Sequence, residues 1–208
     1  MIVQWCMKGL ALDNDNEARN ILDNGNGLVS NWWRTRKEYI PSQLQGLLTT
    51  QTMDMHVNHF NSTSPRTGKP FSQDTPYISL SAGTVERDAM RGTNHVHRAL
   101  KTALLFGTRQ GRQDFAYVYT CWVMLAPRRA CPVEGVAEEV RDLNTYRSYS
   151  PFQLEGEIAA KIAIPDNQVQ SCQKWELDVL SSSFKCAWVQ HNSRFTPPEV
   201  LTNVRTVI

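Results

Sequence analysis

The sequence predicts an α+β fold built as a single domain over residues 1–208. Strand patterns dominate the second half of the chain and helical patterns the first half, without a regular alternation of the two. A composition of 41% hydrophobic and 20% charged residues is ordinary for a globular chain that buries a sizeable core. No internal repeat and no shift in composition marks a second domain, so we assign all 208 residues to one.

The elements of the N-terminal part follow from apolar patterns and their stop signals. Residues 2–12 are apolar enough for a buried or half-buried strand, and a run of Asp and Asn ends it. A short helix is expected over residues 17–23, with Asn16 as its N-cap and an Asn-Gly stop after it. Residues 28–48 are amphipathic, and we expect a partly helical segment that Pro41 breaks.

The middle of the chain predicts a loop, a strand, a long helix and a second strand. Residues 61–75 are rich in Ser, Thr, Pro and Gly and are expected to form a surface loop. It leads into a strand over residues 77–81. Residues 85–106 have an apolar and a wet side at helical spacing, although Gly92 weakens that helix. Residues 115–125 are dense in aromatic and β-branched residues, which favours a strand.

The C-terminal part is predicted to be mainly strands. Residues 136–143 have the pattern of a short helix. Residues 158–164 form an apolar strand that ends at Pro165. Two further strands are expected over residues 175–180 and 187–190.

Charge and hydropathy bear on partners and location. A net charge of +2 is too small to predict a nucleic-acid or membrane partner. No stretch approaches about 18 apolar residues, so no transmembrane helix is expected. The first residues lack both a basic region and a long apolar core, which predicts no signal peptide. We therefore expect a cytoplasmic protein, or one that dedicated machinery delivers into a target cell.

The five cysteines are scattered and odd in number, so they cannot all pair within one chain. This favours a reducing compartment, although two bridges and one free thiol would also fit. No C-x-x-C occurs, and Cys186 with His191 is one loose pair, so no metal site is predicted. No local signature supports a cysteine nucleophile. The histidines stand beside no nucleophile and are expected to be structural or exposed: His56, His59, His95 and His97.

Two short motifs carry most of the chemistry. Residues 77–81 present Ser79 and Ser81, and the start of the 158–164 strand follows Glu155 and Glu157. Side chains at i and i+2 of a strand share one face. A pair of hydroxyls facing a pair of carboxylates suits the binding and cleavage of a polar, glycosidic substrate. Taken singly, each motif is more often a solvated strand face or edge.

The order of these motifs resembles that of mono-ADP-ribosyltransferases of the Arg–Ser–Glu class, particularly the pertussis-toxin-like branch of bacterial ADP-ribosylating toxins. The shared order is strand, helix, aromatic-x-Ser-x-Ser, long helix, aromatic strand, aromatic loop, Glu-x-Glu and then Ile-Pro. It covers about residues 1–170, by order and spacing more than by identity. The resemblance implies two small, roughly perpendicular antiparallel sheets that form a cleft for NAD, with helices on the flanks.

The resemblance also implies an activity and a role for particular residues. Such enzymes are glycosyltransferases that use NAD as a substrate, split its nicotinamide–ribose bond and pass ADP-ribose to a macromolecule. Glu157 would be the catalytic glutamate, and Glu155 would orient or deprotonate the acceptor. Ser79 would hydrogen-bond within the NAD site, and Ser81 would support the geometry around the glutamate. The loop before the carboxylates would recognise the target through Tyr146, Tyr149 or Phe152.

The chain departs from the pattern of that family at two positions. Leu80 replaces a threonine, which matters little because it points to the opposite face of its strand. On the first strand, Lys8 stands where the family has an arginine that grips NAD. A lysine can hold a phosphate as a point charge but lacks the bidentate fork of arginine. Arg34 is the alternative cation, and we favour Lys8 because it lies on the expected strand.

Glu155 favours an arginine acceptor on a protein and thus a toxin or effector activity, because a glutamate at this position goes with arginine acceptors in the family. The same chemistry on RNA or DNA bases is an alternative, since Trp32 and Trp33 lie beside basic residues that could hold phosphates. A second alternative is a non-catalytic binding module of the same fold, for which Lys8 is the warning sign. An antitoxin or immunity protein is a further expected partner.

Overall fold

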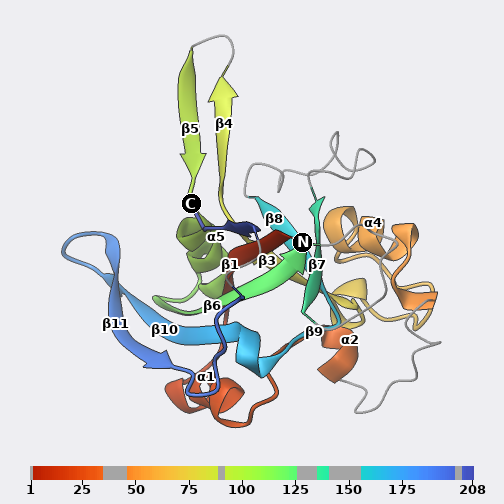
Figure 1. The fold of residues 1–208 in the computed structure, drawn as a ribbon, viewed down its shortest axis with the longest axis horizontal. Helices are drawn as coiled ribbons and strands as arrows, with labels where there is room; N and C mark the ends of the chain where they lie inside the picture. Colours follow the sequence, from red (N-terminus) through yellow and green to blue (C-terminus); the bar gives the residue numbers. More distant parts are fainter. Residues whose placement is uncertain (1, 35–45, 89–91, 126–134, 141–155, 200–202) are drawn as a thin grey trace.

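The fold is a mixed α/β structure in which strands predominate, shown in Figure 1. This computed structural model describes residues 2–34, 46–88, 92–125, 135–140, 156–199 and 203–208. Its longer helices are α1 (Asp15–Asp23), α4 (Thr50–Asn58) and α5 (Ala99–Gly107), with a short helix α2 (Asn31–Arg34). Two 3₁₀ turns are η1 (Phe71–Gln73) and η4 (Asp166–Gln168).

Eight of the strands join into one hydrogen-bonded sheet, in the order β11-β10-β6-β7-β8-β3-β1-β12. Their bounds are β1 Ile2–Leu10, β3 Tyr77–Ser81, β6 Phe115–Leu125, β7 Val136–Glu139, β8 Glu157–Lys161, β10 Val169–Asp178, β11 Ser183–His191 and β12 Asn203–Arg205. Two smaller pairs are β2 (Leu28–Val29) with β9 (Ala163–Ile164), and β4 (Thr84–Asp88) with β5 (Thr93–His97).

The pairing of β1 with β6 closes part of this sheet into a ring. β6 also pairs with β7, β7 with β8, β8 with β3, and β3 with β1. The expectation of two separate small sheets is therefore not confirmed. The joints are narrow, because β1 meets β3 only at Met7 opposite Ser81, and β6 meets β7 at two residue pairs. Short contacts at these two joints thus connect the strands into one sheet.

Helices cover the faces that the strands leave apolar. α1 packs against β10, and the Tyr119 hydroxyl of the adjoining strand β6 donates to the Ala18 carbonyl oxygen of α1 at 2.8 Å. α5 packs against β1 and β6. α4 covers the face of β3 and β8 that carries Tyr77 and Ala159. The opposite side chains of those strands, such as Ile158, point into the main core with residues of β1 and β6.

The strand predictions for residues 77–81 and 115–125 are confirmed at the same bounds. The strand over 158–164 is broken into β8 and β9, and the last two strands are longer than expected. The first helix is confirmed, but its N-cap is Asn14 rather than Asn16, since the Asn14 side chain accepts from the Glu17 amide.

Two predicted helices are wrong. Within residues 85–106 the structure has the hairpin β4–β5 and then the short helix α5. Gly92, at φ +64°, lies in the connection of that hairpin, which projects from the body of the molecule in Figure 1. His95 and His97 therefore lie on β5 rather than on a helix. Residues 136–139 form β7, because pairing with β6 and β8 overrides the local helical pattern.

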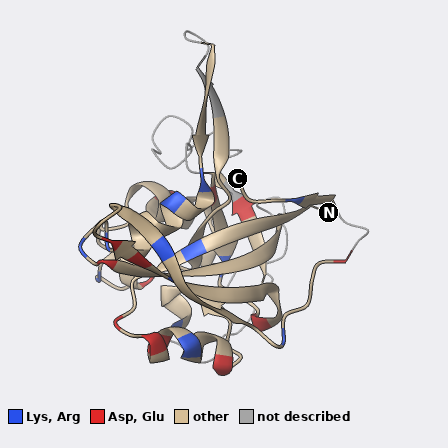
Figure 2. Cartoon of the chain, turned by 90° about the vertical axis from the view of Figure 1, so that its left-hand side faces the viewer, with Lys and Arg blue, Asp and Glu red and all other residues tan. Residues whose placement is uncertain are grey.

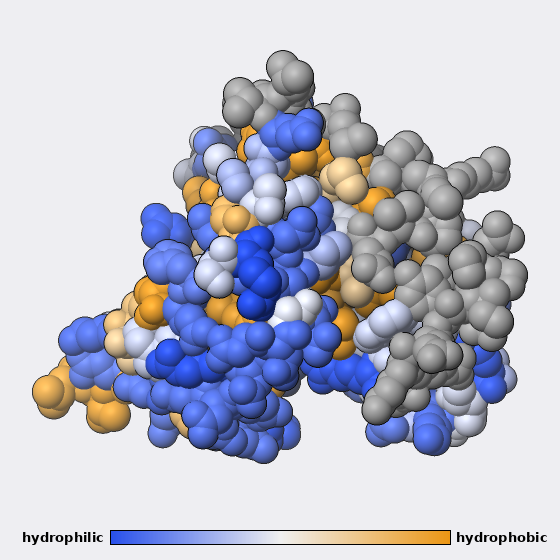
Figure 3. Space-filling view, turned by 60° about the horizontal axis from the view of Figure 1, so that its bottom comes forward, coloured by the Kyte–Doolittle hydropathy of each residue, from blue (hydrophilic) through white to orange (hydrophobic). Residues whose placement is uncertain are grey.

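The surface of the described residues shows mixed charges and an exposed apolar turn. Lysines and arginines are interspersed with acidic residues along the ribbon rather than separated by sign (Figure 2). The turn between β10 and β11 exposes Val179 and Leu180, and Figure 3 shows an apolar tip there at the left. Within the described ranges, no helix is long and apolar enough to cross a bilayer.

Candidate functional site

The turn before β8 aims Glu157. Gly156 has φ +61°, a conformation that only glycine adopts without strain. A Cβ there would lie 2.1 Å from the Gly83 carbonyl oxygen, so the two turns pack backbone against backbone. The Ala82 amide donates to the Gly156 carbonyl oxygen at 2.9 Å. Glu157 then starts β8 directly opposite Ser81, so the predicted serine and glutamate share one face of the sheet.

A close approach of α5 to β1 forms another wall of the site. A Cβ on Gly9 would lie 1.7 Å from the Ala103 carbonyl oxygen, so only glycine allows this contact. The neighbouring residue, Lys8, is half-buried and lines the space between α5 and β3. The first strand thus brings a cation to the predicted serines.

Two adjoining cavities meet at Lys8. We call the first, of about 370 Å³, the Glu157 cavity; it is lined by Glu157, Ser81, Thr102, Phe106 and Gln110 among others. We call the second, of about 620 Å³, the Arg34 cavity; it is lined by Arg34, Asn26, Ser30, Asn31 and Thr75 among others. Lys8, His56, Phe60 and Ser79 line both. Each volume is in the range of about 300–1,000 Å³ that is typical of small-molecule sites.

The Lys8 ammonium makes no hydrogen bond or ion pair with any residue in the described ranges. Burial lowers its pKa to about 8, an effect that the negative charge of Glu157 opposes and the positive charge of Arg34 reinforces. At neutral pH the lysine is therefore mostly charged and open to an anionic ligand.

His56 is the main residue of the site that the sequence analysis missed. It lies on α4, is 4% exposed, and is held by two hydroxyls. Its Nε2 is 2.9 Å from Ser79 Oγ, and its Nδ1 is 2.8 Å from Thr75 Oγ1. Burial, followed by the charge of Lys8, lowers the pKa of His56 to about 3. The ring is thus neutral at ordinary pH and donates through one nitrogen while it accepts through the other.

This state of His56 predicts an acid-sensitive fold. Because the folded state keeps the pKa near 3 and the unfolded chain has a value near 6.5, the unfolded state binds the proton first as the pH falls. The free energy of unfolding should therefore decrease as the pH falls from 6.5, by an amount approaching about 1.4 kcal/mol per pH unit from this residue. Urea unfolding of the wild type and of His56→Gln between pH 7 and pH 5 measures it. The His59→Gln variant is the control, because the His59 side chain is 57% exposed; an equal pH slope in wild type and His56→Gln would contradict the assignment.

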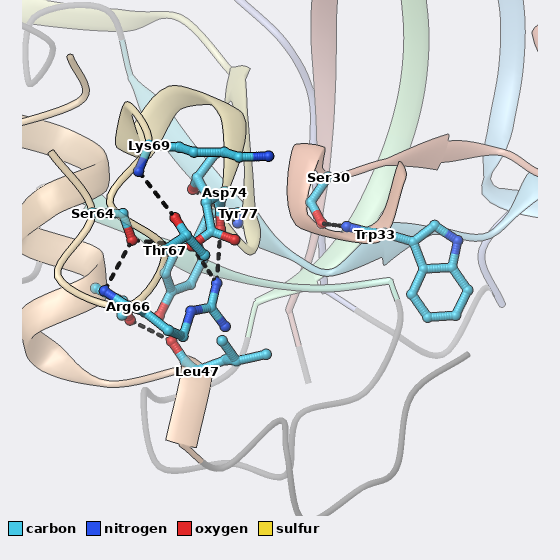
Figure 4. Close-up of polar contacts among 11 residues, drawn as sticks. Ser30, Trp33, Leu47, Ser64, Arg66, Thr67, Lys69, Asp74 and Tyr77 are labelled. Carbon is cyan, nitrogen blue, oxygen red and sulfur yellow. Dashed lines mark hydrogen bonds and ion pairs between the residues drawn. The ribbon is translucent and has the colours of Figure 1, made fainter. Parts of the chain in front are cut away.

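The loop before β3 holds Thr75 against His56. Asp74 is 5% exposed and accepts from Ser64 Oγ at 3.0 Å and from Thr67 Oγ1 at 3.3 Å. Arg66 pairs with the Asp74 carboxylate at 2.6 Å, and Figure 4 shows these side chains converging on it. The segment predicted as a surface loop thus contains a buried polar cluster around Asp74. Because Asp74 is held in place, its neighbour Thr75 is held against His56.

The Trp32–Trp33 pair is not an exposed stacking platform. Trp32 is fully buried in a small core with Leu47 and Ile162. Trp33 is half-buried, and its backbone amide donates to the Ser30 hydroxyl (Figure 4). Arg34, at the end of α2, is exposed and lines the Arg34 cavity.

Of the predicted site residues, the structure brings together Lys8, Ser79, Ser81 and Glu157 around one cavity, with Arg34 on the adjoining one. Glu155, Tyr146, Tyr149 and Phe152 lie outside the described residues. A signal for His56 was present in the sequence. It stands three residues after Met53 and one before Val57, both buried on α4, so it shares the apolar face of that helix.

The fold of this chain is similar to that of solved structures. No protein-family model and no curated protein sequence matches the chain. Among solved structures, EcPltA is 14% identical, with 99% of this chain and 94% of that chain covered and a TM-score of 0.52. The fold is similar to that of ADP-ribosyltransferase toxins.

Two further neighbours are toxins with lower scores. A variant of heat-labile enterotoxin is 15% identical, over 96% of this chain and 81% of that chain, with a TM-score of 0.48. Scabin, a toxin from Streptomyces scabies, is 11% identical, with 94% of this chain and 77% of that chain covered and a TM-score of 0.43.

Proposed function

We propose that this chain is a mono-ADP-ribosyltransferase that moves ADP-ribose from NAD to a macromolecular acceptor. The observation that carries the proposal is the convergence of Lys8, Ser79 and Glu157, from three separate strands, where two cavities adjoin. In this proposal the lysine cation fits the diphosphate of NAD, and the serine hydroxyl fits a ribose. The carboxylate fits the positive charge that develops during the reaction. The fold, similar to that of ADP-ribosyltransferase toxins, supports the same activity.

Each of these residues has a distinct chemical task in the proposal. The Glu157 carboxylate holds the ribose 2′-hydroxyl and stabilises the positive charge that develops as the nicotinamide–ribose bond breaks. Lys8 holds a phosphate as a point charge. Ser79, oriented by its contact with His56, hydrogen-bonds to the substrate. Ser81 supports the carboxylate from the opposite strand.

The acceptor that we propose is an arginine side chain on a protein, which Glu155 would orient and the aromatic residues Tyr146, Tyr149 and Phe152 would help to recognise. Modification of RNA or DNA bases is one of the two alternatives. Burial of Trp32 removes half of the aromatic pair on which that alternative depended. We further propose a single-domain toxin or effector of the pertussis-toxin-like branch, acting in the cytoplasm of its own or a target cell. Such an activity calls for an antitoxin or immunity protein as a partner.

The test is the release of nicotinamide from NAD by the purified chain, alone, with polyarginine, and with purified RNA. We expect slow release by the chain alone and faster release with polyarginine, because an acceptor removes the ADP-ribose. Acceleration by RNA alone would reassign the acceptor class. No release under any of these conditions, from a protein that is folded by circular dichroism, would leave a binding module of the same fold.

A further inference from the structure

β8 carries a second charged residue, four positions after Glu157. Lys161 is 1% exposed, and its ammonium lies 3.2 Å from an oxygen of Glu138, which is 4% exposed and lies on the neighbouring strand β7. The other carboxylate oxygen of Glu138 is buried and makes no hydrogen bond with the described residues. A buried ion pair with an unsatisfied oxygen contributes little to the free energy of folding, so stability alone does not explain why the pair is present.

The strand registers place this pair on the same face as the site. Ala159 of β8 lies opposite both Ser79 of β3 and Glu138 of β7. Since opposite residues share a face and side chains alternate, Glu157, Ala159 and Lys161 all point toward α4. Ile158 and Ala160 point the other way, into the main core.

The apolar residues of β8 specify this orientation only weakly. All five residues of the strand are buried, and small apolar side chains lie on both faces. A slip of one residue would exchange the faces and turn Glu157 into the main core. After such a slip, alanine or isoleucine side chains would still occupy both faces of the strand. The burial of apolar side chains would therefore disfavour the wrong register only slightly. Lys161, by contrast, can pair with the Glu138 carboxylate only when it lies on the face toward α4.

The end of the strand needs such an anchor. Ile162, the next residue, has φ +61°, which is a strained conformation for a β-branched residue. Its amide donates to the Pro76 carbonyl oxygen at 2.7 Å, and its own carbonyl oxygen accepts from the Ser30 amide at 2.8 Å. The first bond continues the register of β8 with β3, and the second directs the chain toward Ser30, so the chain leaves β3 at Ile162. A residue fixed just before this point influences which face the preceding residues present.

We propose that the Glu138–Lys161 pair fixes the register of β8 and thereby aims Glu157 into the Glu157 cavity. Both members are positioning residues that act through Glu157, and this part of the inference rests on the proposed function. Glu157 is itself polar, and the competing explanation is that it alone sets the register.

The decisive variant replaces both charges at once, as Glu138→Leu with Lys161→Met. It leaves no buried charge without a partner, so we expect a folded protein whose melting temperature is equal to or above that of the wild type. Cross-strand NOEs in the NMR spectrum report whether Ser79 still lies opposite Ala159. We expect a weakened or doubled set of these NOEs, and a kcat for nicotinamide release that falls at least about tenfold while KM changes less.

Two further variants complete the experiment. The reversed pair, Glu138→Lys with Lys161→Glu, restores the attraction and should keep the native NOEs and kcat within about threefold. The control, Asp166→Leu with Arg194→Met, removes an ion pair between η4 and the segment after β11, neither of which pairs with β8. It should leave both the NOEs and kcat unchanged.

A single native set of NOEs in the apolar variant overturns the proposal, whatever its kcat. If that variant fails to fold, the reversed pair decides, because loss of the native register there overturns the proposal as well. The NOEs need no NAD. A wild type that releases no nicotinamide would therefore refute the proposed function and still leave the register test intact.

Discussion

Glu157→Gln should lower the rate of nicotinamide release by about 10²- to 10³-fold and leave the melting temperature unchanged. The substitution keeps the shape of the side chain and removes its negative charge. A charge that stabilises the transition state acts strongly at this position, because the side chain is only 9% exposed and the surrounding dielectric is low. The effect should fall on kcat rather than on KM, since the positive charge develops only as the glycosidic bond breaks.

The matched control for this experiment is Glu17→Gln. Glu17 is an exposed carboxylate that lines the Arg34 cavity and accepts from the Asp13 amide. It carries the same charge near the same groove but lies away from Ser79 and Ser81, so its loss should change the rate little. A fall of many degrees in the melting temperature of Glu157→Gln would instead make Glu157 a structural residue. Equal rates in the two variants would contradict its assignment as the catalytic carboxylate.

The parts of the site that the sequence could predict are those that depend on strand periodicity. Ser79 and Ser81 share a face because they are two residues apart, and Glu157 joins them because β8 pairs with β3. For these three residues a local rule determines where the side chain points, and a single strand pairing supplies the rest. Lys8 was predicted differently, because the resemblance implies a cation at that position of the first strand, which the structure has as β1.

The parts that could not be predicted depend on contacts between distant segments. His56 reaches Ser79 only because α4 packs across β3, and Thr75 reaches His56 only because Asp74 anchors the loop before β3. The segment 85–106 has helical spacing, yet its first part forms the hairpin β4–β5. Propensity over a short window is a weak preference, and tertiary pairing overrides it.

If the proposed function holds, the lysine on β1 should make recognition of NAD depend on pH. The pKa of Lys8 in the free protein is about 8, because burial disfavours the charged form more than Glu157 favours it. We therefore expect kcat/KM for NAD to decrease as the pH rises through 8, by up to about tenfold per pH unit well above it. Lys8→Arg should remove this decrease, since a guanidinium stays charged to a pH above 12. Lys101→Arg, on the exposed face of α5, is the control.

The same pKa makes a prediction about stability that requires no NAD. Between pH 8 and pH 10.5 the unfolded chain keeps the Lys8 proton while the folded protein has lost it. The free energy of unfolding of the wild type, measured relative to Lys8→Met, should therefore increase with pH across that window. Ionisation of Cys121 in the unfolded chain opposes this trend. Burial raises the pKa of Cys121 to about 12 although the charge of Lys8 opposes the rise, so the folded thiol stays protonated through this window with or without Lys8, and its effect cancels in the difference. If the decrease in kcat/KM near pH 8 persists in Lys8→Arg, another group titrates there. If the stability difference is also flat, Lys8 is not desolvated in the folded protein, and the cation that meets the phosphates must be sought at Arg34.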